Sequence, residues 1–336
     1  MPTPSLSVVI PNYNHAPFLG EVLEAIARQS FPPNEIIVID DASTDGSLEV
    51  FEEFARGCKS ARLIRNERNL GVCPAVNVGL AAATGDYVRI QPADDLILPG
   101  FFEKSMAMLA ANPQAAFSST LSLVIGRDGS ILGPNRTPVI SSRPIYVPPE
   151  AAGRSLERHG FWIVSDASIF KRSSMLREGG YDRELGALAD GYLDVALLIK
   201  EGGCFIPERL ACWRKLDGSY ALGQSIDAFM AANARLNERL GALSGLPRSF
   251  VRRWTRDRVN AVLYEADRQG ELSADDASRM IGLMPTRGIS DRLMLHCLRR
   301  HPEQRRLWIK LYIFFQQSPR DQMRIAAGRL AKLFSG

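Results

Sequence analysis

Residues 35–46 have the sequence EIIVIDDASTDG, and this stretch decides the fold class. The segment Glu35–Ile39 is a nearly continuous apolar run, and it ends in Asp40-Asp41. Such a run is typical of a parallel strand that is buried on both faces. The polar residues 43–45 are of the types that cap helices. The stretch therefore predicts a strand, a polar turn and a helix, the repeating unit of an α/β fold.

The same alternation continues on both sides of this stretch. Further strands are predicted at 5–10, 62–64 and 87–90, and apolar residues at helical spacing predict helices around 19–27, 48–55 and 74–83. Strands that alternate with helices form a doubly wound, mostly parallel sheet. Ligands of such sheets bind beyond the carboxyl ends of the strands. We therefore expect the functional residues in the loops that follow the predicted strands.

The pattern changes from about residue 115. Asp128-Gly129 predicts a hairpin turn, and a proline-rich connection follows it. A helix is predicted from Asp190 to Glu201 and is stopped by Gly202-Gly203. Residues 225–336 are expected to be mostly helical. The chain thus changes from an alternating to a helical character along its length.

The composition is that of an ordinary globular protein, with 46% hydrophobic and 23% charged residues. The five cysteines have no CxxC spacing, which argues against a disulfide framework or a structural zinc site and for a reducing compartment. The first residues contain no signal-peptide pattern, and no apolar stretch is long enough to span a membrane. We expect a cytoplasmic protein.

Polar residues that suit ligand binding follow three of the predicted strands. Tyr13 follows the first and can stack on a base through its ring face, although a packed loop tyrosine is an equal alternative. Asp41 follows the second and can accept a hydrogen bond from a base imide. Asp94 and Asp95 follow the fourth strand. The convergence of these strand ends predicts one crevice.

Asp94-Asp95 is the candidate metal site. Adjacent carboxylates suit Mg²⁺ or Mn²⁺, hard cations that prefer oxygen ligands. A cation here would neutralise the charge that grows on a diphosphate leaving group. The alternative is an acidic pair at a helix N-terminus, favoured by the helix dipole.

Five motifs in the first third of the chain resemble family 2 glycosyltransferases in order and spacing. They are VVIPNYN (8–14), IVIDDASTDGS (37–47), NLG (69–71), ATGDY (83–87) and ADD (93–95). The resemblance is strong over residues 5–105. It continues more weakly to about 222 through GGYD (179–182), FIPE (205–208) and WR (213–214). The motifs are specific for the family and carry no information about the sugar.

The resemblance implies a GT-A fold, a divalent metal and inverting transfer from a nucleotide-diphosphate sugar. The residues expected to contact the nucleotide sugar are Pro11, Asn12, Tyr13, Asp40, Asp41 and Asp94. Asp94 and Asp95 would contact the Mn²⁺ or Mg²⁺ ion. Asp190 would be the catalytic base. UDP- and dTDP-sugars are expected as donors because the family commonly uses them.

The chemistry supports Asp190 independently. Inversion by direct displacement needs a carboxylate that takes the acceptor's proton, and this group must lie across the sugar from the metal. It should therefore come from another segment of the chain. Asp190 opens a predicted helix, so a role as a helix cap is the alternative. Asp194 is the second candidate for the base.

Three positions depart from the family pattern. Pro92 stands in place of the first aspartate of the usual DxD motif, Ala189 in place of a glutamate, and Val76 in place of an arginine. Arg214 or Lys215 can neutralise the pyrophosphate, with an exposed basic pair as the alternative. Pro92 and Ala189 motivate one rival function, a non-catalytic nucleotide-sugar-binding relative. The second rival is a nucleotidyltransferase on a related fold, but such an enzyme usually has a glycine-rich, basic triphosphate loop after the first strand, where this chain has PNYNH (11–15).

The domains and partners follow from this interpretation. We expect a glycosyltransferase domain at 1–222, with a nucleotide-binding half to about 112 and an acceptor half from about 113, and a helical domain at 223–336. The acceptor is expected to be a saccharide or a lipid-linked hydroxyl in bacterial polysaccharide or glycolipid assembly.

The charge is divided unevenly along the chain. Residues 1–224 carry a formal charge of −5 and residues 225–336 carry +9. The basic tail, including Arg299-Arg300, Arg305-Arg306 and Lys310, alternates with apolar residues. This pattern has two interpretations, a helix packed on the catalytic domain with a solvated basic face and a helix in peripheral contact with an anionic membrane. No nucleic-acid-binding motif is present, and no nucleic-acid partner is expected.

Overall fold

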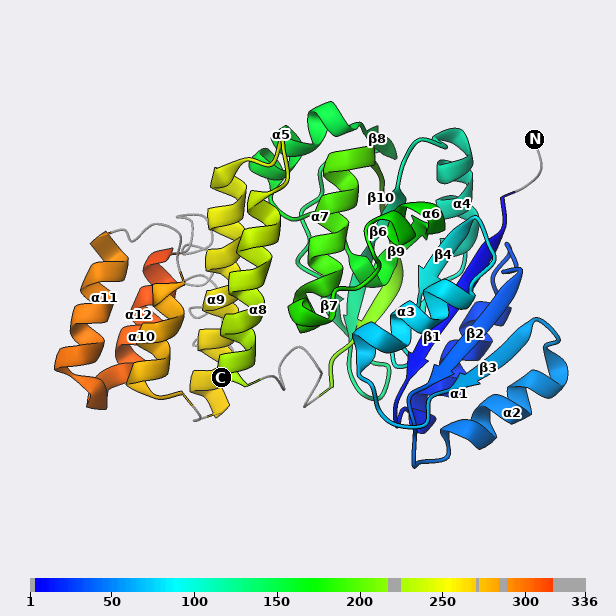
Figure 1. The fold of residues 1–336 in the computed structure, drawn as a ribbon, viewed down its shortest axis with the longest axis horizontal. Coiled ribbons are helices and arrows are strands. Elements are labelled where there is room, and N and C mark those ends of the chain that lie inside the picture. Colours follow the sequence, from blue (N-terminus) through cyan, green and yellow to red (C-terminus); the bar gives the residue numbers. More distant parts are fainter. Residues whose placement is uncertain (1–3, 217–224, 270–271, 284–288, 317–336) are drawn as a thin grey trace, which may run out of the picture. The chain divides into compact units, whose positions relative to one another are not determined.

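A ten-stranded, mostly parallel sheet lies at the centre of the first part of the chain (Figure 1). The computed structural model describes residues 4–216, 225–269, 272–283 and 289–316. The strands are β1 (Leu6–Asn12), β2 (Glu35–Asp40), β3 (Ala61–Arg65), β4 (Tyr87–Ile90), β5 (Leu96–Ile97), β6 (Phe117–Ile125), β7 (Ile131–Pro134), β8 (Ile145–Val147), β9 (Ser168–Lys171) and β10 (Gly203–Arg214). The predicted α/β fold with a mostly parallel sheet is confirmed.

The strand order is β3-β2-β1-β4-β9-β6-β10-β5, with β7 beside β6 and β8 beside β10. Strands β1 to β4 pair in parallel, as predicted. Strand β9 runs antiparallel to both of its neighbours, β4 and β6. Strands β6 and β10 are again parallel. The sheet therefore contains two parallel groups joined through the reversed strand β9, and the short strands β5, β7 and β8 also run antiparallel to their neighbours.

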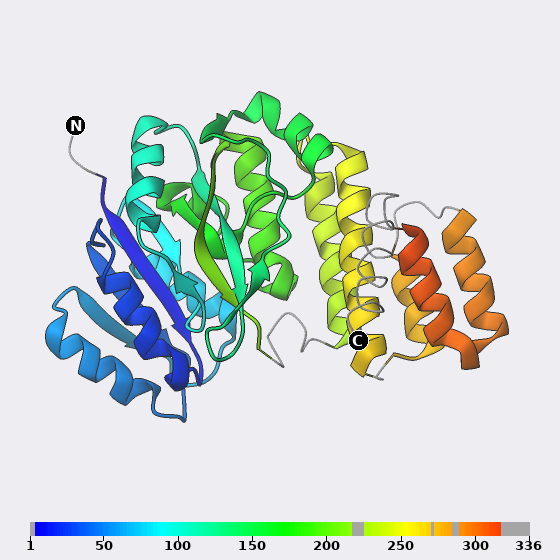
Figure 2. The same cartoon turned by 180° about the vertical axis from the view of Figure 1, so that it is seen from behind.

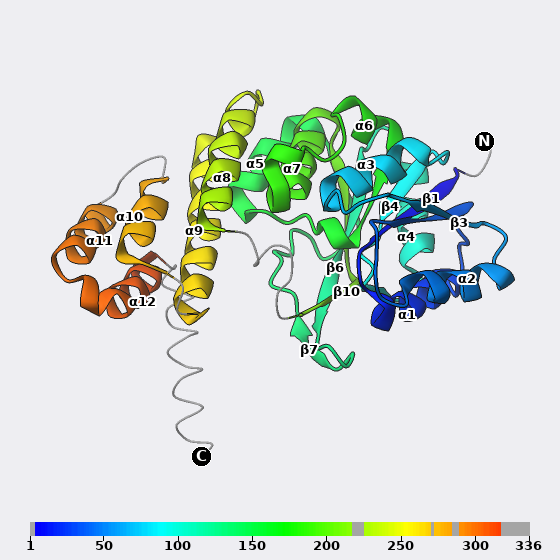
Figure 3. The same ribbon diagram turned by 60° about the horizontal axis from the view of Figure 1, so that its bottom comes forward.

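Helices cover both faces of the sheet (Figure 3). Helices α1 (Ala16–Ala27), α2 (Ser47–Gly57) and α4 (Phe101–Ala111) lie on one face, and α3 (Val72–Ala82), α6 (Arg172–Arg177) and α7 (Ala189–Glu201) lie on the other. Seen from behind, α1 and α2 stand out in blue in front of the sheet (Figure 2). Helix α5 (Pro149–His159) and the short 3₁₀ turns η1 (Ser165–Ala167) and η2 (Arg183–Leu188) lie in the second half of the sheet region.

The alternation of side chains along β1 explains the two layers. Leu6, Val8 and Ile10 belong to one buried apolar cluster with residues of α1 and α4. Val9 points the other way, toward α3. Gly79 of α3 lies so close that a Cβ atom there would come within 2.2 Å of the Val9 side chain. Helix α3 therefore packs directly against the strands that carry the site.

The chain forms two compact units. The first contains residues 1–221 together with 235–250, and the second contains 222–234 and 251–336. Residues 235–250 belong to the first unit, where Arg239 pairs with Asp182 at 3.3 Å. The division into units therefore assigns residues 235–250 to the first unit. The predicted glycosyltransferase domain at 1–222 and helical domain at 223–336 stay a prediction.

The second unit is helical in the part that the structure describes. The helices of the C-terminal region are α8 (Ile226–Gly241), α9 (Arg248–Gln269), α10 (Ala274–Gly282), α11 (Ile289–Arg300) and α12 (Arg305–Gln316), with the 3₁₀ turn η3 (Pro302–Gln304) between the last two. Helices α9 to α12 share a buried apolar core that includes Val259, Met280 and Ile309. The helical character predicted for this region is confirmed for the described residues.

The basic tail is described only in part. Lys310 and Leu311 are exposed on α12, whereas Ile309 and Tyr312 of the same helix are buried. The tail beyond residue 316 lies outside the described residues. Membrane contact of this region stays a prediction. None of the described helices combines the length and the apolar character that a membrane crossing requires.

Candidate active site

The loops after β1 and β2 lie side by side at the carboxyl edge of the sheet. The Asp41 backbone N–H donates to the Asn12 carbonyl at 2.8 Å. The Asn12 side chain is buried and donates to Asp40 at 3.3 Å and to Ser43 Oγ at 3.1 Å. The structure thus uses Asn12 and Asp40 to join the two loops. Their contact with a nucleotide stays a prediction.

The turn between β2 and α2 contains a residue in an unusual conformation. Ala42 has a φ of 64°, in the left-handed region that residues other than glycine rarely adopt. Asn14, in the facing loop, has a φ of 58°, and its side chain accepts a hydrogen bond from Thr44 N at 2.8 Å. Each loop therefore helps to hold the other in a tight turn.

Asp41 connects this edge to the start of α3. Its carboxylate accepts hydrogen bonds from Asn66 Nδ2 at 2.8 Å, from the Leu70 N–H at 3.0 Å and from the Gly71 N–H at 2.8 Å. The side chain is 3% exposed. Asp41 therefore fixes the loop before α3, and a contact with a base imide stays a prediction. Tyr13, in contrast, is 44% exposed, so its ring is accessible for stacking.

Asp94 and Asp95 are adjacent in sequence but differ in surroundings. Asp95 is 4% exposed, and its Oδ1 accepts a hydrogen bond from the Arg214 N–H at 2.7 Å. Burial, followed by the charges of Asp166 and Asp94, raises the pKa of Asp95 well above its ordinary value. Asp94 is only half-buried, and no side-chain hydrogen bond to it occurs within the described part of the chain. No helix begins at this pair, because strand β5 follows it.

Arg214 is not an exposed cation. It is 2% exposed and donates to the Asp94 carbonyl at 2.7 Å, to the Arg127 carbonyl at 3.0 Å and to the Glu21 carboxylate at 2.8 Å. The expectation of an exposed basic pair is wrong for Arg214, because its donors are already used by the protein. Only Lys215 of the pair is exposed.

Asp190 lies in the first turn of α7 and faces other carboxylates. Its Oδ1 accepts a hydrogen bond from the Gly191 N–H at 2.6 Å, and the helix cap is Leu188 rather than Asp190. Burial raises the pKa of Asp190 to about 6, and the charge of Asp166 adds to this rise, against the lowering effect of the Gly191 hydrogen bond. A carboxyl group with such a pKa is a suitable general base near neutral pH.

Asp166 brings the two acidic segments together. It lies on η1 and is close enough to Asp94 for that charge to raise its pKa, although burial is the larger cause and Arg89 opposes it. The carboxylates of Asp94, Asp166 and Asp190 therefore form one electrostatic group that draws on three segments of the chain. In the sequence, Asp166 is distinguished only as the one charged residue of the largely apolar run 161–170.

Asp194, the second candidate for the base, is 1% exposed. Its Oδ2 accepts a hydrogen bond from Ser165 Oγ at 2.6 Å. Burial, with a further contribution from Asp190, raises its pKa well above the ordinary value, which favours the neutral form of this carboxyl group. Its burial and its hydrogen bond to Ser165 leave Asp194 less accessible to an acceptor hydroxyl than Asp190. Burial and hydrogen bonding therefore favour Asp190.

The start of α3 contacts both the loop that carries Asp41 and the segment that precedes Asp190. Gly71 N–H binds Asp41, and two residues later the Cys73 thiol donates to the Gly186 carbonyl at 3.5 Å. The charge of Asp190 contributes to a raised pKa of Cys73, after the larger effect of burial. The glycine pair before Asp182 is also held by α3, since Asn77 exchanges two 2.8 Å hydrogen bonds with the Tyr181 backbone. The predicted residues therefore surround one region of the sheet edge.

The residues present fit a cation only in part. Within the described residues no three carboxylate, histidine or cysteine side chains form a ready metal site. Asp94 has the accessibility and the oxygen donors of a ligand for Mg²⁺ or Mn²⁺. Asp95 is engaged with Arg214. The proposed metal contact of this pair therefore rests mainly on Asp94, with the remaining ligands to come from the substrate.

A hollow of about 570 Å³ lies between β8 and α5. It is lined by apolar residues such as Ile145 together with Arg154, Arg158 and His159. Strand β8 pairs with Gly203–Phe205, at the opposite end of β10 from Arg214. This hollow is therefore remote from the carboxylates and does not belong to the candidate active site.

The strand order, the helices on both faces and the carboxylates at one edge define a GT-A fold. The family model for glycosyl transferase family 2 matches residues 7–174. The chain belongs to glycosyltransferase family 2. An uncharacterized glycosyltransferase of Haemophilus influenzae is 34% identical over 131 residues, which cover 39% of this chain and 41% of that protein.

Two solved structures share the fold. The structure of S. aureus TarS 1–349 in complex with UDP-GlcNAc has a TM-score of 0.61 and 17% identity, and the match covers 94% of this chain and 92% of that 1–349 chain. The mannosyltransferase PcManGT of Pyrobaculum calidifontis, in complex with GDP-Man and Mn²⁺, has a TM-score of 0.52 and 19% identity and covers 92% and 86%. At these identities the likeness shows the fold alone.

Proposed function

We propose that this chain is an inverting glycosyltransferase that moves a sugar from a nucleotide-diphosphate donor to an acceptor hydroxyl. The placement of Asp190 carries the proposal. Its carboxylate lies in electrostatic contact with Asp166, which in turn interacts with Asp94. A base with a pKa of about 6 thus lies near the loop that would hold the donor diphosphate.

The reaction would proceed by direct displacement. The acceptor oxygen attacks the anomeric carbon of the donor sugar from the face opposite the diphosphate. The carbon–oxygen bond to the diphosphate breaks as the new glycosidic bond forms, which inverts the anomeric configuration. Asp190 takes the proton that the acceptor hydroxyl loses. The nucleoside diphosphate leaves with the electron pair of the broken bond.

The nucleotide would bind at the edge formed by the β1 and β2 loops. The exposed ring of Tyr13 offers a stacking surface, and Pro11, Asn12, Asp40 and Asp41 shape the loops around it. A divalent cation on Asp94 would supply positive charge to the leaving diphosphate. The nucleotide sugars in the TarS and PcManGT complexes, and the Mn²⁺ in the latter, support this class of donor.

The acceptor would be a saccharide hydroxyl, free or lipid-linked, in polysaccharide or glycolipid assembly. The basic C-terminal region would then hold the enzyme near an anionic membrane. Flotation with anionic vesicles at low salt tests this contact, and zwitterionic vesicles are the control. Absence of the protein from both floating fractions would reject the membrane part of the proposal and leave the transfer reaction untouched.

The reaction is tested in two stages. A panel of nucleotide sugars with Mn²⁺ is first screened for a rise in melting temperature, because a ligand that binds the folded state alone stabilises it. The stabilising donors are then incubated with methyl glycosides, and release of the nucleoside diphosphate and of the glycoside product is measured. We expect turnover that requires the metal and that Asp94→Asn and Asp190→Asn each reduce by at least about 100-fold.

The result also separates the rival functions. Stabilisation by a nucleotide sugar without turnover would support a non-catalytic binding relative. Release of pyrophosphate from a nucleoside triphosphate and a sugar phosphate would instead support a nucleotidyltransferase. Full activity in the Asp94→Asn, Asp190→Asn double variant would reject the site assignment.

A further inference from the structure

Arg89 is a fully buried cation in a central strand. It lies in β4 with 0% exposure, and its guanidinium stacks over the Phe101 ring at 5.4 Å. Burial lowers its pKa to about 10, so it stays charged at neutral pH. A buried charge destabilises a protein unless it is well paired. The partners of Arg89 therefore indicate why the position holds an arginine.

The guanidinium joins two separate segments of the chain. Nη2 donates to the Asp166 carbonyl at 2.7 Å, and Nη1 donates to the carbonyls of Ser165 and Ser168, each at 3.3 Å. Nε and Nη2 both donate to Gln91 Oε1, at 3.2 and 2.9 Å. Arg89 thus holds two of the three η1 carbonyls and the carbonyl of Ser168, the first residue of β9, on one side and Gln91 on the other.

Gln91 extends this connection to the loop that carries Asp94. Its Nε2 donates to the Asp95 carbonyl at 2.8 Å and to the Pro92 carbonyl at 3.1 Å. Gln91 is also 0% exposed. The buried Gln91 amide therefore holds the carbonyls of Pro92 and Asp95, which flank Ala93-Asp94. Arg89 in turn orients this amide.

On the other side, η1 connects to α7. Ser165, whose carbonyl binds Arg89, donates its hydroxyl to Asp194 at 2.6 Å. Asp194 lies one helical turn after Asp190. A continuous series of buried and partly buried hydrogen bonds thus runs from the β4–β5 loop through Gln91, Arg89 and Ser165 to the helix of the proposed base.

We propose that Arg89 and Gln91 form a positioning pair that fixes the loop of Asp94 relative to η1 and α7, and so sets the spacing between the donor and the base. Neither residue touches the reacting atoms. This role rests on the proposed function, because it assigns Asp94 to the donor side and Asp190 to the acceptor side. The carbonyl partners of the pair all lie in residues 92–95 and 165–168, the two segments that carry Asp94, Asp95 and Asp166. A role in stability alone would not require this restriction.

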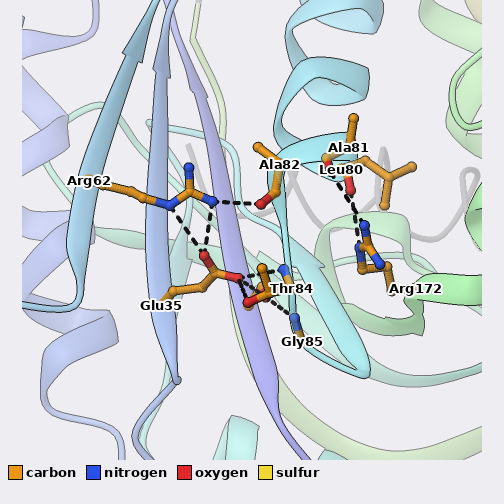
Figure 4. A network of polar contacts seen from close by, with 9 residues as sticks. Glu35, Arg62, Leu80, Ala81, Ala82, Thr84, Gly85 and Arg172 are labelled. Carbon is orange, nitrogen blue, oxygen red and sulfur yellow. Dashed lines mark hydrogen bonds and ion pairs between the residues drawn. The ribbon is translucent and has the colours of Figure 1, made fainter.

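The test uses graded variants of the pair. Arg89→Met removes every donor, and Arg89→Lys keeps the charge but cannot bind both segments at once. Gln91→Met releases the Asp94 loop alone. The control is Arg172→Met, because Arg172 also donates to two backbone carbonyls, those of Leu80 and Ala81, at a place remote from the site (Figure 4).

Two measurements follow the pair independently. Amide hydrogen exchange reports the loop 92–97 and the segment 164–168 without any substrate. We expect exchange about tenfold faster in both segments for Arg89→Met and in 92–97 alone for Gln91→Met. The second measurement is the ratio of glycoside transfer to donor hydrolysis, with the donor and methyl glycoside found in the screen above. This ratio does not depend on the fraction of folded enzyme.

We expect the ratio of transfer to hydrolysis to fall about 10- to 100-fold in Arg89→Lys and Gln91→Met, because a small displacement weakens the alignment of acceptor and base. The KM for the nucleotide sugar should stay within about twofold.

The control variant Arg172→Met should lower the melting temperature and leave the ratio unchanged. An unchanged ratio in both pair variants would overturn the proposal. If the wild type turns over no nucleotide sugar, the proposed function and the catalytic role of the pair both fail, while unchanged exchange would show that the structural link itself is wrong.

Discussion

A carboxylate at the amino ends of the parallel strands has very different surroundings from the acidic group at their carboxyl ends. At the amino edge, Glu35 is surrounded by donors (Figure 4). It accepts hydrogen bonds from Ser7 Oγ at 2.7 Å, from Thr84 N at 2.6 Å and from Arg62 at 3.0 Å. Burial acts to raise the pKa of Glu35, but these hydrogen bonds outweigh it and lower the pKa to about 2. This carboxylate stabilises the fold.

At the carboxyl edge, several carboxylates lie close enough to repel one another, and few hydrogen-bond donors surround them. Burial and mutual repulsion raise the pKa of Asp95, Asp166, Asp190 and Asp194. Such an arrangement is unfavourable for the empty protein and suits the binding of positive charge or the acceptance of a proton. The comparison teaches that hydrogen bonds stabilise the charged form of Glu35, whereas burial and repulsion oppose the charged forms of the acidic group around Asp190. Asp41 lies at the same carboxyl edge but is held by hydrogen bonds, as Glu35 is.

The largest effect is expected from Asp190→Asn. The change keeps the shape of the side chain and removes its ability to take a proton, so kcat for transfer should fall about 1,000-fold. The melting temperature should stay the same or rise, because a desolvated charge is removed. Product formation and thermal unfolding, measured on one preparation, check both parts.

Asp194→Asn is the matched control for that change. Asn still accepts the Ser165 hydrogen bond, and burial already favours the neutral form of the carboxyl group that it replaces by raising its pKa, so we expect kcat within a few-fold of the wild type. A severe loss in Asp194→Asn together with high activity in Asp190→Asn would exchange their roles.

The second expectation concerns the pH dependence of activity. Asp190 must be deprotonated to act as the base, and its pKa is about 6. The rate kcat/KM should therefore be constant above about pH 7 and fall about tenfold for each pH unit well below 6. Measurement of initial rates from pH 4.5 to 8.5 checks this. A rate that stays constant down to pH 4.5 would show that the base has an ordinary carboxylate pKa or that the proton goes elsewhere.

Much of the fold could be predicted because its signals are local. The apolar runs that became β1, β2 and β4 and the glycine stop after α7 follow from neighbouring residues alone. The reversed direction of β9 could not be predicted, because its partners Tyr87 and Phe117 lie far away in sequence. Strand β5 has two residues, too few for any periodicity.

The candidate site shows the same division. The sequence indicated the edge and named Asp94, Asp95 and Asp190, but it could not distinguish Asp94 from Asp95, because only the distant Arg214 backbone engages one of them. In the sequence, Arg89 is notable only as a charged residue in the predicted strand 87–90. Its backbone acceptors lie 76 to 79 residues later, a separation that no local pattern reports.

The third expectation concerns stability at the amino edge. Glu35→Gln should lower the free energy of unfolding by about 2 kcal/mol at pH 7, because it removes a charge held by several donors. The lowered pKa means that this contribution is complete above about pH 4.5 and is lost as the pH falls toward 2. Denaturant unfolding at pH 7 and at low pH should therefore show a difference that narrows with acid.

Glu24→Gln is the control for Glu35. Glu24 pairs with Arg28 across one helical turn, and the two side chains are 61% and 78% exposed. An exposed pair of this kind contributes little, so the expected change is below about 0.5 kcal/mol. Equal losses in the two variants would mean that the Glu35 network stabilises the sheet no more than a surface ion pair.

The smallest effect is expected at the carboxyl edge, from Ala42→Gly. Ala42 has a φ of 64°, and a Cβ atom in this conformation costs roughly 1 kcal/mol that glycine avoids. The variant should unfold at a temperature about 2–4 °C higher. Ala81→Gly, an identical change at an exposed position of α3, should shift the temperature the other way because glycine disfavours a helix. If both variants are destabilised, the turn after β2 stores no strain, and the contrast between the two edges is one of charge alone.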